Sequence, residues 1–174
     1  MNIRTIRYDH PDAVKLDEEV QAEYAERYGD EGDLTPMDAG HFDPPHGLYL
    51  IAYDEDGTPL ASGGWRSQKR SEEGYADGDA ELKRMFVVRA ARGQGLARLI
   101  LAALEDSART AGRVRMVLET GTMQPEAIGL YTSCGYEPVT KFGLYRFEES
   151  SRCFAKSLVL SGAAHQKNQP GVAL

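Results

Sequence analysis

The pattern of apolar and polar residues predicts three short β-strands within residues 1–66. Apolar and polar residues alternate over residues 3–8, and apolar runs bounded by turn residues cover residues 47–53 and 59–66. Residues 54–57, Asp-Glu-Asp-Gly, are typical of a tight turn between the second and third strands. We therefore expect these two strands to pair as an antiparallel hairpin.

Three segments have apolar residues at helical spacing. The first starts at Pro11, and the second runs from Leu96 to Ala108 with apolar residues three, four, seven and eight positions apart. The third starts at Pro125, a residue suited to a first helical turn, and ends at Gly135, a residue suited to the position after a helix. These segments predict three helices, each with one apolar face.

The remaining segments complete a mixed α/β domain. Residues 81–88 and 114–120 are predicted strands, and residues 137–160 a strand, a loop and a strand. The long connection at residues 29–46 is of the kind that often forms a binding loop or lid. We expect one domain over residues 1–160 and a flexible C-terminal tail over residues 161–174, because a chain of 174 residues has room for one sizeable core.

The composition narrows the classes of partner. The chain has 20 Lys and Arg against 27 Asp and Glu and a pI of about 5.1, without a basic stripe, which argues against a nucleic-acid partner. No apolar run is long enough for a membrane span and the start lacks a signal peptide, so we expect a cytoplasmic protein. The two cysteines and four histidines have no metal-ligand spacing, so we expect no metal.

The strongest chemical signal is a glycine turn between a predicted strand and a predicted helix. Gly93 and Gly95 allow the backbone to turn tightly and to approach a ligand closely. The first amides of the following helix and its dipole favour an anion such as a pyrophosphate. A sharp turn without any ligand is the competing interpretation.

Three classes of phosphate-binding turn were compared at this position. A P-loop needs a Gly-Lys pair, which the chain lacks, and a Rossmann turn needs a third glycine where the chain has Arg98. The third is the acyl-coenzyme A turn, Arg/Gln-x-x-Gly-x-Gly/Ala. It is matched in full by Arg92-Gly93-Gln94-Gly95-Leu96-Ala97.

At these residues the chain resembles the GNAT superfamily of N-acetyltransferases. Residues 81–88 resemble its fourth strand, residues 92–97 its pyrophosphate loop and residues 114–120 its fifth strand. Residues 124–136 resemble its Asn-x-x-Ala-x-x-Leu-Tyr-x-x-x-Gly-Phe segment, with Gln124 where the superfamily usually has Asn. Several phrases, among them Glu-Leu-Lys-Arg-Met and Leu-Glu-Thr-Gly, are similar to a bacterial group loosely labelled indoleacetate-related acetyltransferases.

The resemblance implies a single-domain α/β fold with a mixed, mostly antiparallel sheet that splays apart between its fourth and fifth strands. Acetyl-coenzyme A would lie in the opening as cosubstrate. The coenzyme site that the resemblance implies consists of Met85, Phe86, Val87, Arg92, Gly93, Gln94, Gly95, Leu96, Ala97, Arg98, Gln124 and Ala127.

The resemblance also implies two catalytic residues. An alkylammonium acceptor has a pKa of about 10 and must lose a proton before its nitrogen can attack the thioester. Glu81 is the candidate base, and a strand-end residue paired with Lys83 or Arg84 is the alternative interpretation. Tyr131 is the candidate general acid for the leaving thiolate, with a packed core tyrosine as the alternative.

These observations predict an enzyme that moves an acetyl group from acetyl-coenzyme A to a primary amine of a small molecule, by direct attack in a ternary complex. An acidic surface suits a cationic acceptor. The competing interpretations are a non-catalytic acyl-coenzyme A sensor and a nucleotide-dependent oxidoreductase. The resemblance leaves a homodimer open.

Overall fold

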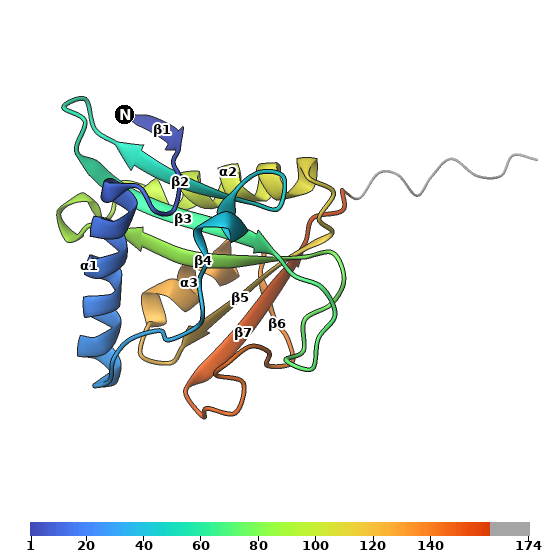
Figure 1. Ribbon diagram of the computed structural model, residues 1–174. Helices are drawn as coiled ribbons and strands as arrows, with labels where there is room; N and C mark the ends of the chain where they lie inside the picture. The colour runs from blue at the N-terminus through green and yellow to red at the C-terminus, as the bar shows by residue number, and fades with distance from the viewer. Residues whose placement is uncertain (161–174) are drawn as a thin grey trace, which may run out of the picture.

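The computed structural model describes residues 1–160 and shows a seven-stranded sheet flanked by helices (Figure 1). The tail predicted at residues 161–174 lies outside the described residues. The strand order is β1-β2-β3-β4-β5-β7-β6, and neighbouring strands are antiparallel except for β4 and β5. The strands are β1 (Asn2–Thr5), β2 (Gly47–Tyr53), β3 (Pro59–Ser67), β4 (Asp79–Val87), β5 (Arg115–Gly121), β6 (Glu137–Pro138) and β7 (Ser151–Ser157).

Helices cover both faces of the sheet. Helix α1 (Pro11–Tyr28) lies on one face, and α2 (Leu96–Thr110) and α3 (Pro125–Ser133) lie on the other (Figure 1). Alternate residues of β2 show this division, since Tyr49 and Ile51 pack in the cluster with α1, whereas Leu50 and Ala52 pack in the cluster with α2. The short helical turns η1 (Ala39–Phe42) and η2 (Arg89–Ala91) lie in the connections.

The helix boundaries follow local chemistry. The His10 ring nitrogen accepts a hydrogen bond from the Asp12 amide and caps the start of α1, and Gly29, with φ 68°, ends it. Helix α2 buries the predicted stripe of Leu96, Ile100 and Leu104 against the sheet. The three predicted helices are therefore confirmed.

The sheet splits between β4 and β5. The two strands pair only at Asp79–Arg115, Ala80–Met116 and Glu81–Val117, after which β4 continues beside β3 and β5 continues beside β7. In Figure 1, β5 and β7 fan away from β4 beyond this point. The mixed α/β fold with a splayed sheet, which the resemblance implied, is confirmed.

A bulge in β4 lies next to the split. The register with β3 shifts between Ser62 and Gly64, and Arg84 on β4 has φ 57°, in the left-handed region. Side-chain contacts hold this conformation, since Arg84 donates to Asp17 at 2.6 Å and to Asp33 at 2.7 Å. The bulge therefore depends on contacts from α1 and from the loop that follows it.

Several strand boundaries differ from the sequence-based prediction by one to three residues, most of all in β1 and β4. β1 ends at Thr5 and not at Tyr8. Ile6 makes one more hydrogen bond to β2, to the Tyr49 carbonyl. The chain then turns, and the His10 amide donates to the Arg7 carbonyl. β4 starts at Asp79, two residues earlier than predicted.

The closed end of the split is held by a buried ion pair. The Asp79 carboxylate is 1% exposed and accepts two hydrogen bonds from the Arg115 guanidinium, at 2.8 and 2.9 Å. This paired fork is the strong geometry for an arginine and a carboxylate. It joins the first residue of β4 to the first residue of β5.

Replacing Arg115 with Ala is expected to lower the free energy of unfolding by about 2–3 kcal/mol, because Asp79 would remain buried without its cation. The loss in an Asp79→Ala/Arg115→Ala double variant should be smaller than the sum of the single losses. Urea unfolding measures both. Arg70→Ala, at an exposed arginine, is the control, and an Arg115→Ala loss no larger than this control would contradict the prediction.

Candidate active site

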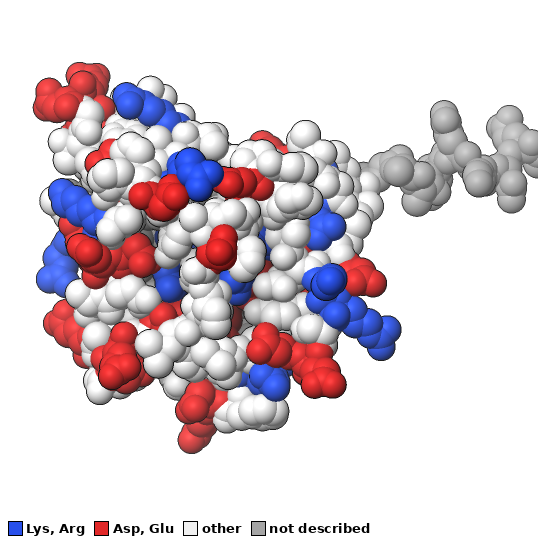
Figure 2. All heavy atoms as spheres, viewed as in Figure 1, with Lys and Arg blue, Asp and Glu red and all other residues white. Residues whose placement is uncertain are grey.

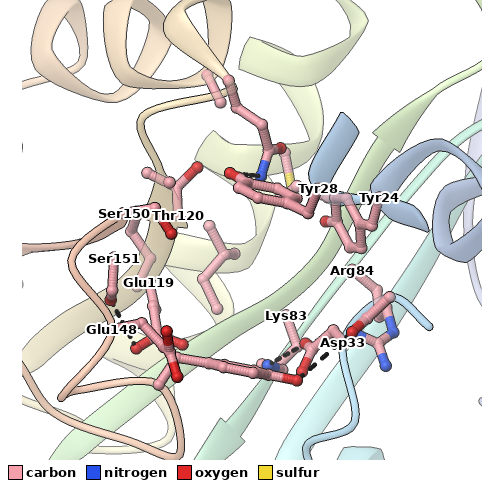
Figure 3. Close-up of a pocket in the computed structure, with 18 of the residues that line it drawn as sticks. Tyr24, Tyr28, Asp33, Lys83, Arg84, Glu119, Thr120, Glu148, Ser150 and Ser151 are labelled. Atoms are coloured by element: carbon pink, nitrogen blue, oxygen red, sulfur yellow. Dashed lines mark hydrogen bonds and ion pairs between the residues drawn. The ribbon is translucent and has the colours of Figure 1, made fainter. Parts of the chain in front are cut away.

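A cavity of about 320 Å³ lies where β4 and β5 part (Figure 3). Its walls come from the end of α1 and the loop after it, the middle of β4, the second half of β5, the start of α3 and the loop between β6 and β7. The loop predicted as a binding loop or lid contributes Asp30, Gly32 and Asp33 to the lining. The volume is at the low end of the range for small-molecule sites.

Tyr131 lines the cavity from α3. The residue is 7% exposed, its ring packs edge-on against Tyr136, and its hydroxyl has no hydrogen-bond partner within residues 1–160. Burial raises its pKa above the ordinary value. The side chain therefore keeps its proton and offers it to whatever occupies the cavity.

Glu119 lines the cavity from β5 and was not identified as a candidate base from the sequence. Its carboxylate accepts a hydrogen bond from the Ser151 hydroxyl at 3.1 Å and has no Lys or Arg ion-pair partner within residues 1–160. Burial raises its pKa to about 7, against the opposing effect of the nearby Lys83 ammonium. A lone acidic residue in an apolar strand, in the phrase Leu-Glu-Thr-Gly, was the available signal.

Glu81, the candidate base from the sequence, does not line the cavity. It is 3% exposed and accepts hydrogen bonds from Arg66 at 2.7 Å, from Gln68 at 3.2 Å and from the Tyr75 hydroxyl. The alternative interpretation named Lys83 or Arg84 as the ion-pair partner of Glu81. Glu81 does form an ion pair, but its partner is Arg66. Arg66 lies opposite Glu81 on the adjacent antiparallel strand, and this closeness follows from sheet register.

Lys83 and Arg84 bind a different carboxylate. Asp33 Oδ2 accepts hydrogen bonds from Lys83 Nζ at 2.8 Å and from Arg84 Nη1 at 2.7 Å. Burial opposes ionisation of Asp33, but the two cations hold its pKa well below the usual range. In the view of Figure 3, this group lies across the cavity from Glu119 and Ser151.

The glycine turn lies outside the cavity lining, at the start of α2. Gly93 and Gly95 have φ 81° and 80°, and a Cβ on either would meet no atom within 4 Å, so the space above the turn is open. Gly95 caps α2 without a side-chain hydrogen bond. No side chain caps the first amides of this helix, so they remain available to an anion.

The other residues of the implied coenzyme site fall into two groups. Met85, Gln124 and Ala127 line the cavity. The remaining ones do not, and the Phe86 side chain packs in the cluster with α1. Two arginines have protein partners, since Arg92 donates to Glu23 and to the Val87 carbonyl and Arg98 donates to Ser133 and Cys134.

Gln124, where the sequence departs from the usual Asn, connects α3 to α1. Its side-chain amide donates to the Tyr28 hydroxyl at 3.2 Å. A Cβ on Gly121 would overlap that hydroxyl, so Tyr28 reaches over β5 only because residue 121 is glycine. Arg27 also pairs with Glu126 on α3. These contacts bridge the opening of the split sheet above the cavity.

Charges of both signs are interspersed over the face seen in Figure 2. Within residues 1–160, no group of three or more His, Cys, Asp or Glu side chains is placed to hold a metal ion. In the same part of the chain, no helix combines the length and hydrophobicity that crossing a bilayer requires.

The split sheet, the open glycine turn and the cavity with an unpartnered tyrosine are together typical of the acyltransferase class of enzymes. The model of the acetyltransferase (GNAT) family matches residues 13–136. The IAA acetyltransferase of Azospirillum brasilense is 36% identical over 120 residues, which are 66% of this chain and 74% of that protein. The chain therefore belongs to the acetyltransferase (GNAT) family and is an N-acetyltransferase of the GNAT type.

Solved structures agree with this assignment. A candidate acyl-CoA N-acyltransferase from Klebsiella pneumoniae is 28% identical with a TM-score of 0.71, covering 91% of this chain and 97% of that one. An aminoglycoside 6'-N-acetyltransferase solved with coenzyme A shares the fold, with 15% identity, a TM-score of 0.66 and coverage of 92% and 98%. The oxidoreductase and sensor interpretations are set aside.

Proposed function

We propose that the protein transfers an acetyl group from acetyl-coenzyme A to a primary amine of a small molecule by direct attack. The observation that carries the proposal is the meeting of Glu119 and Tyr131 in one cavity. One is an unpaired carboxylate with a pKa of about 7, and the other is the hydroxyl of a tyrosine that is 7% exposed, without a hydrogen-bond partner within residues 1–160. Such a pair supplies the base and the proton donor that amine acylation needs.

The glycine turn and the edge of β4 fit acetyl-coenzyme A. The open amides at the start of α2 suit the pyrophosphate, and the unpaired half of β4 offers backbone groups to an amide-containing arm. Met85 and Ala127 lie where this edge meets the cavity. When bound, the coenzyme supplies a thioester whose carbonyl carbon accepts the amine. The relative solved with coenzyme A supports this assignment.

Glu119 is the better placed of two carboxylates for the base. The acceptor ammonium loses one proton to Glu119, and the freed nitrogen then forms the C–N bond as the C–S bond breaks. A second proton leaves the nitrogen and reaches the sulfur. Glu81 is shielded from the cavity by its contacts with Arg66 and Tyr75, so it would act only by way of other groups.

Tyr131 would stabilise the departing thiolate. A free thiol has a pKa of about 8.5, and burial raises the pKa of Tyr131 further above that value. The hydroxyl therefore keeps its proton and donates a hydrogen bond to the sulfur, with the amine proton completing the thiol. This hydrogen bond forms only as negative charge develops on the sulfur.

Gly95→Glu should weaken acetyl-coenzyme A binding at least tenfold, about 1.4 kcal/mol. The change puts a side chain and a negative charge at the start of α2 and strains a residue at φ 80°. Isothermal titration measures the affinity, and Gly57→Glu, at a surface turn with φ 81°, controls for backbone strain. Equal affinity in a folded Gly95→Glu variant would contradict the coenzyme site.

Glu119→Gln and Glu81→Gln should separate the two candidate bases. In the native protein, kcat/KM should rise about tenfold per pH unit and level off above pH 7, where Glu119 is ionised. Burial contributes most to the raised pKa of Glu119, Asp33 and Glu81 raise it further, and Lys83 and Ser151 lower it. Glu119→Gln should lower the rate by about 10²–10⁴-fold and remove this break, whereas Glu81→Gln should keep it. The reverse result would make Glu81 the base.

Tyr131→Phe should lower kcat by about 10²–10⁴-fold while the melting temperature and the acetyl-coenzyme A affinity stay near native values. The ring keeps its packing against Tyr136, and only the unpartnered hydroxyl is removed. Tyr136→Phe is the matched control on the neighbouring ring. A Tyr131→Phe variant of native activity would return Tyr131 to a packing role.

A further inference from the structure

The charged side chains of the cavity indicate what kind of amine it accepts. Six charged residues line it: Asp30, Asp33, Lys83, Arg84, Glu119 and Glu148. Both cations share the Asp33 carboxylate, and Arg84 also binds Asp17. Neither cation of the lining is therefore free to receive a carboxylate carried by the acceptor.

The other three carboxylates of the lining have no cationic partner. Asp30, Glu119 and Glu148 form no ion pair with any Lys or Arg within residues 1–160. Glu119 lies inside the cavity, whereas Asp30 and Glu148 are exposed at its mouth, on the loop after α1 and on the loop before β7. Carboxylates that line a hollow concentrate cations and repel anions.

Aromatic side chains add to this preference. Tyr24, Tyr28 and Tyr145 also line the cavity. Ring faces attract organic cations and also pack against methylene groups. Tyr131, which is 7% exposed and lines the cavity with a hydroxyl that has no partner within residues 1–160, independently marks this cavity as a ligand site.

We propose that the acceptor is a small alkylamine that carries a second positive charge and no carboxylate, such as a short diamine. This inference rests on the proposed function. The reacting ammonium lies against Glu119, to which it gives its proton, and the second ammonium lies against Asp30 and Glu148 at the mouth. Net transfer forms one amide bond, breaks one thioester bond and leaves the distal ammonium unchanged.

Three acceptors of equal chain length test the proposal on the full-length protein. They are diaminobutane with amines at both ends, butylamine, and aminobutyric acid with an amine at one end and a carboxylate at the other. Thiol release from acetyl-coenzyme A, with product identification by mass spectrometry, gives kcat/KM for each. Diaminobutane should exceed butylamine by about fivefold, as expected for ion pairs at exposed carboxylates, and butylamine should exceed aminobutyric acid.

The Asp30→Asn/Glu148→Gln double variant should lose most of the diamine preference. Glu149→Gln is the matched control, because Glu149 is the exposed neighbour of Glu148 and does not line the cavity. An unchanged preference in the double variant, or native kcat/KM values that are equal for diaminobutane and butylamine, would overturn the proposal while leaving amine acetylation intact. Thiol release with none of the amines would overturn the proposed function itself, and this inference with it.

Discussion

The structure depends on the way β4 and β5 are joined at one end and separated at the other. Three residue pairs and the buried Asp79–Arg115 fork hold the closed end. Beyond it, each strand keeps its hydrogen bonds with its other neighbour, so the split leaves both strands ordered. The cavity, the free edge of β4 and the start of α3 all lie on the open side. A sheet paired along its full length would have no room for a donor and an acceptor.

The open side is kept in shape by charge. Arg84 adopts a left-handed conformation that costs a non-glycine residue about 1–3 kcal/mol, and its ion pairs with Asp17 and Asp33 offset this cost. The same Asp33 also binds Lys83, so one carboxylate anchors the loop after α1 and neutralises the cations of the lining. Glu119 is left without an ion-pair partner, and its pKa rises as a consequence of burial.

Helices α1 and α3 are connected across the cavity. Tyr28 and Arg27 of α1 contact Gln124 and Glu126 of α3 across the opening. Gln124 occupies a position where the superfamily usually has Asn, and its longer side chain bonds to a tyrosine of the cavity wall. The start of α3 therefore takes part in shaping the cavity.

Local patterns in the sequence determined the elements, the glycine turn and the inward position of Tyr131, because periodicity and turn chemistry act over a few residues. The proposed choice of Glu119 over Glu81 as the base rests on tertiary structure. Glu81 and Glu119 both lie in apolar strands, and the family resemblance pointed to Glu81. Arg66 and Tyr75 bind Glu81 only after β3 and the following loop have packed, whereas Glu119 meets an open cavity. Whether a carboxylate is free to accept a proton depends on partners that are distant in sequence. Only the folded chain brings these partners together.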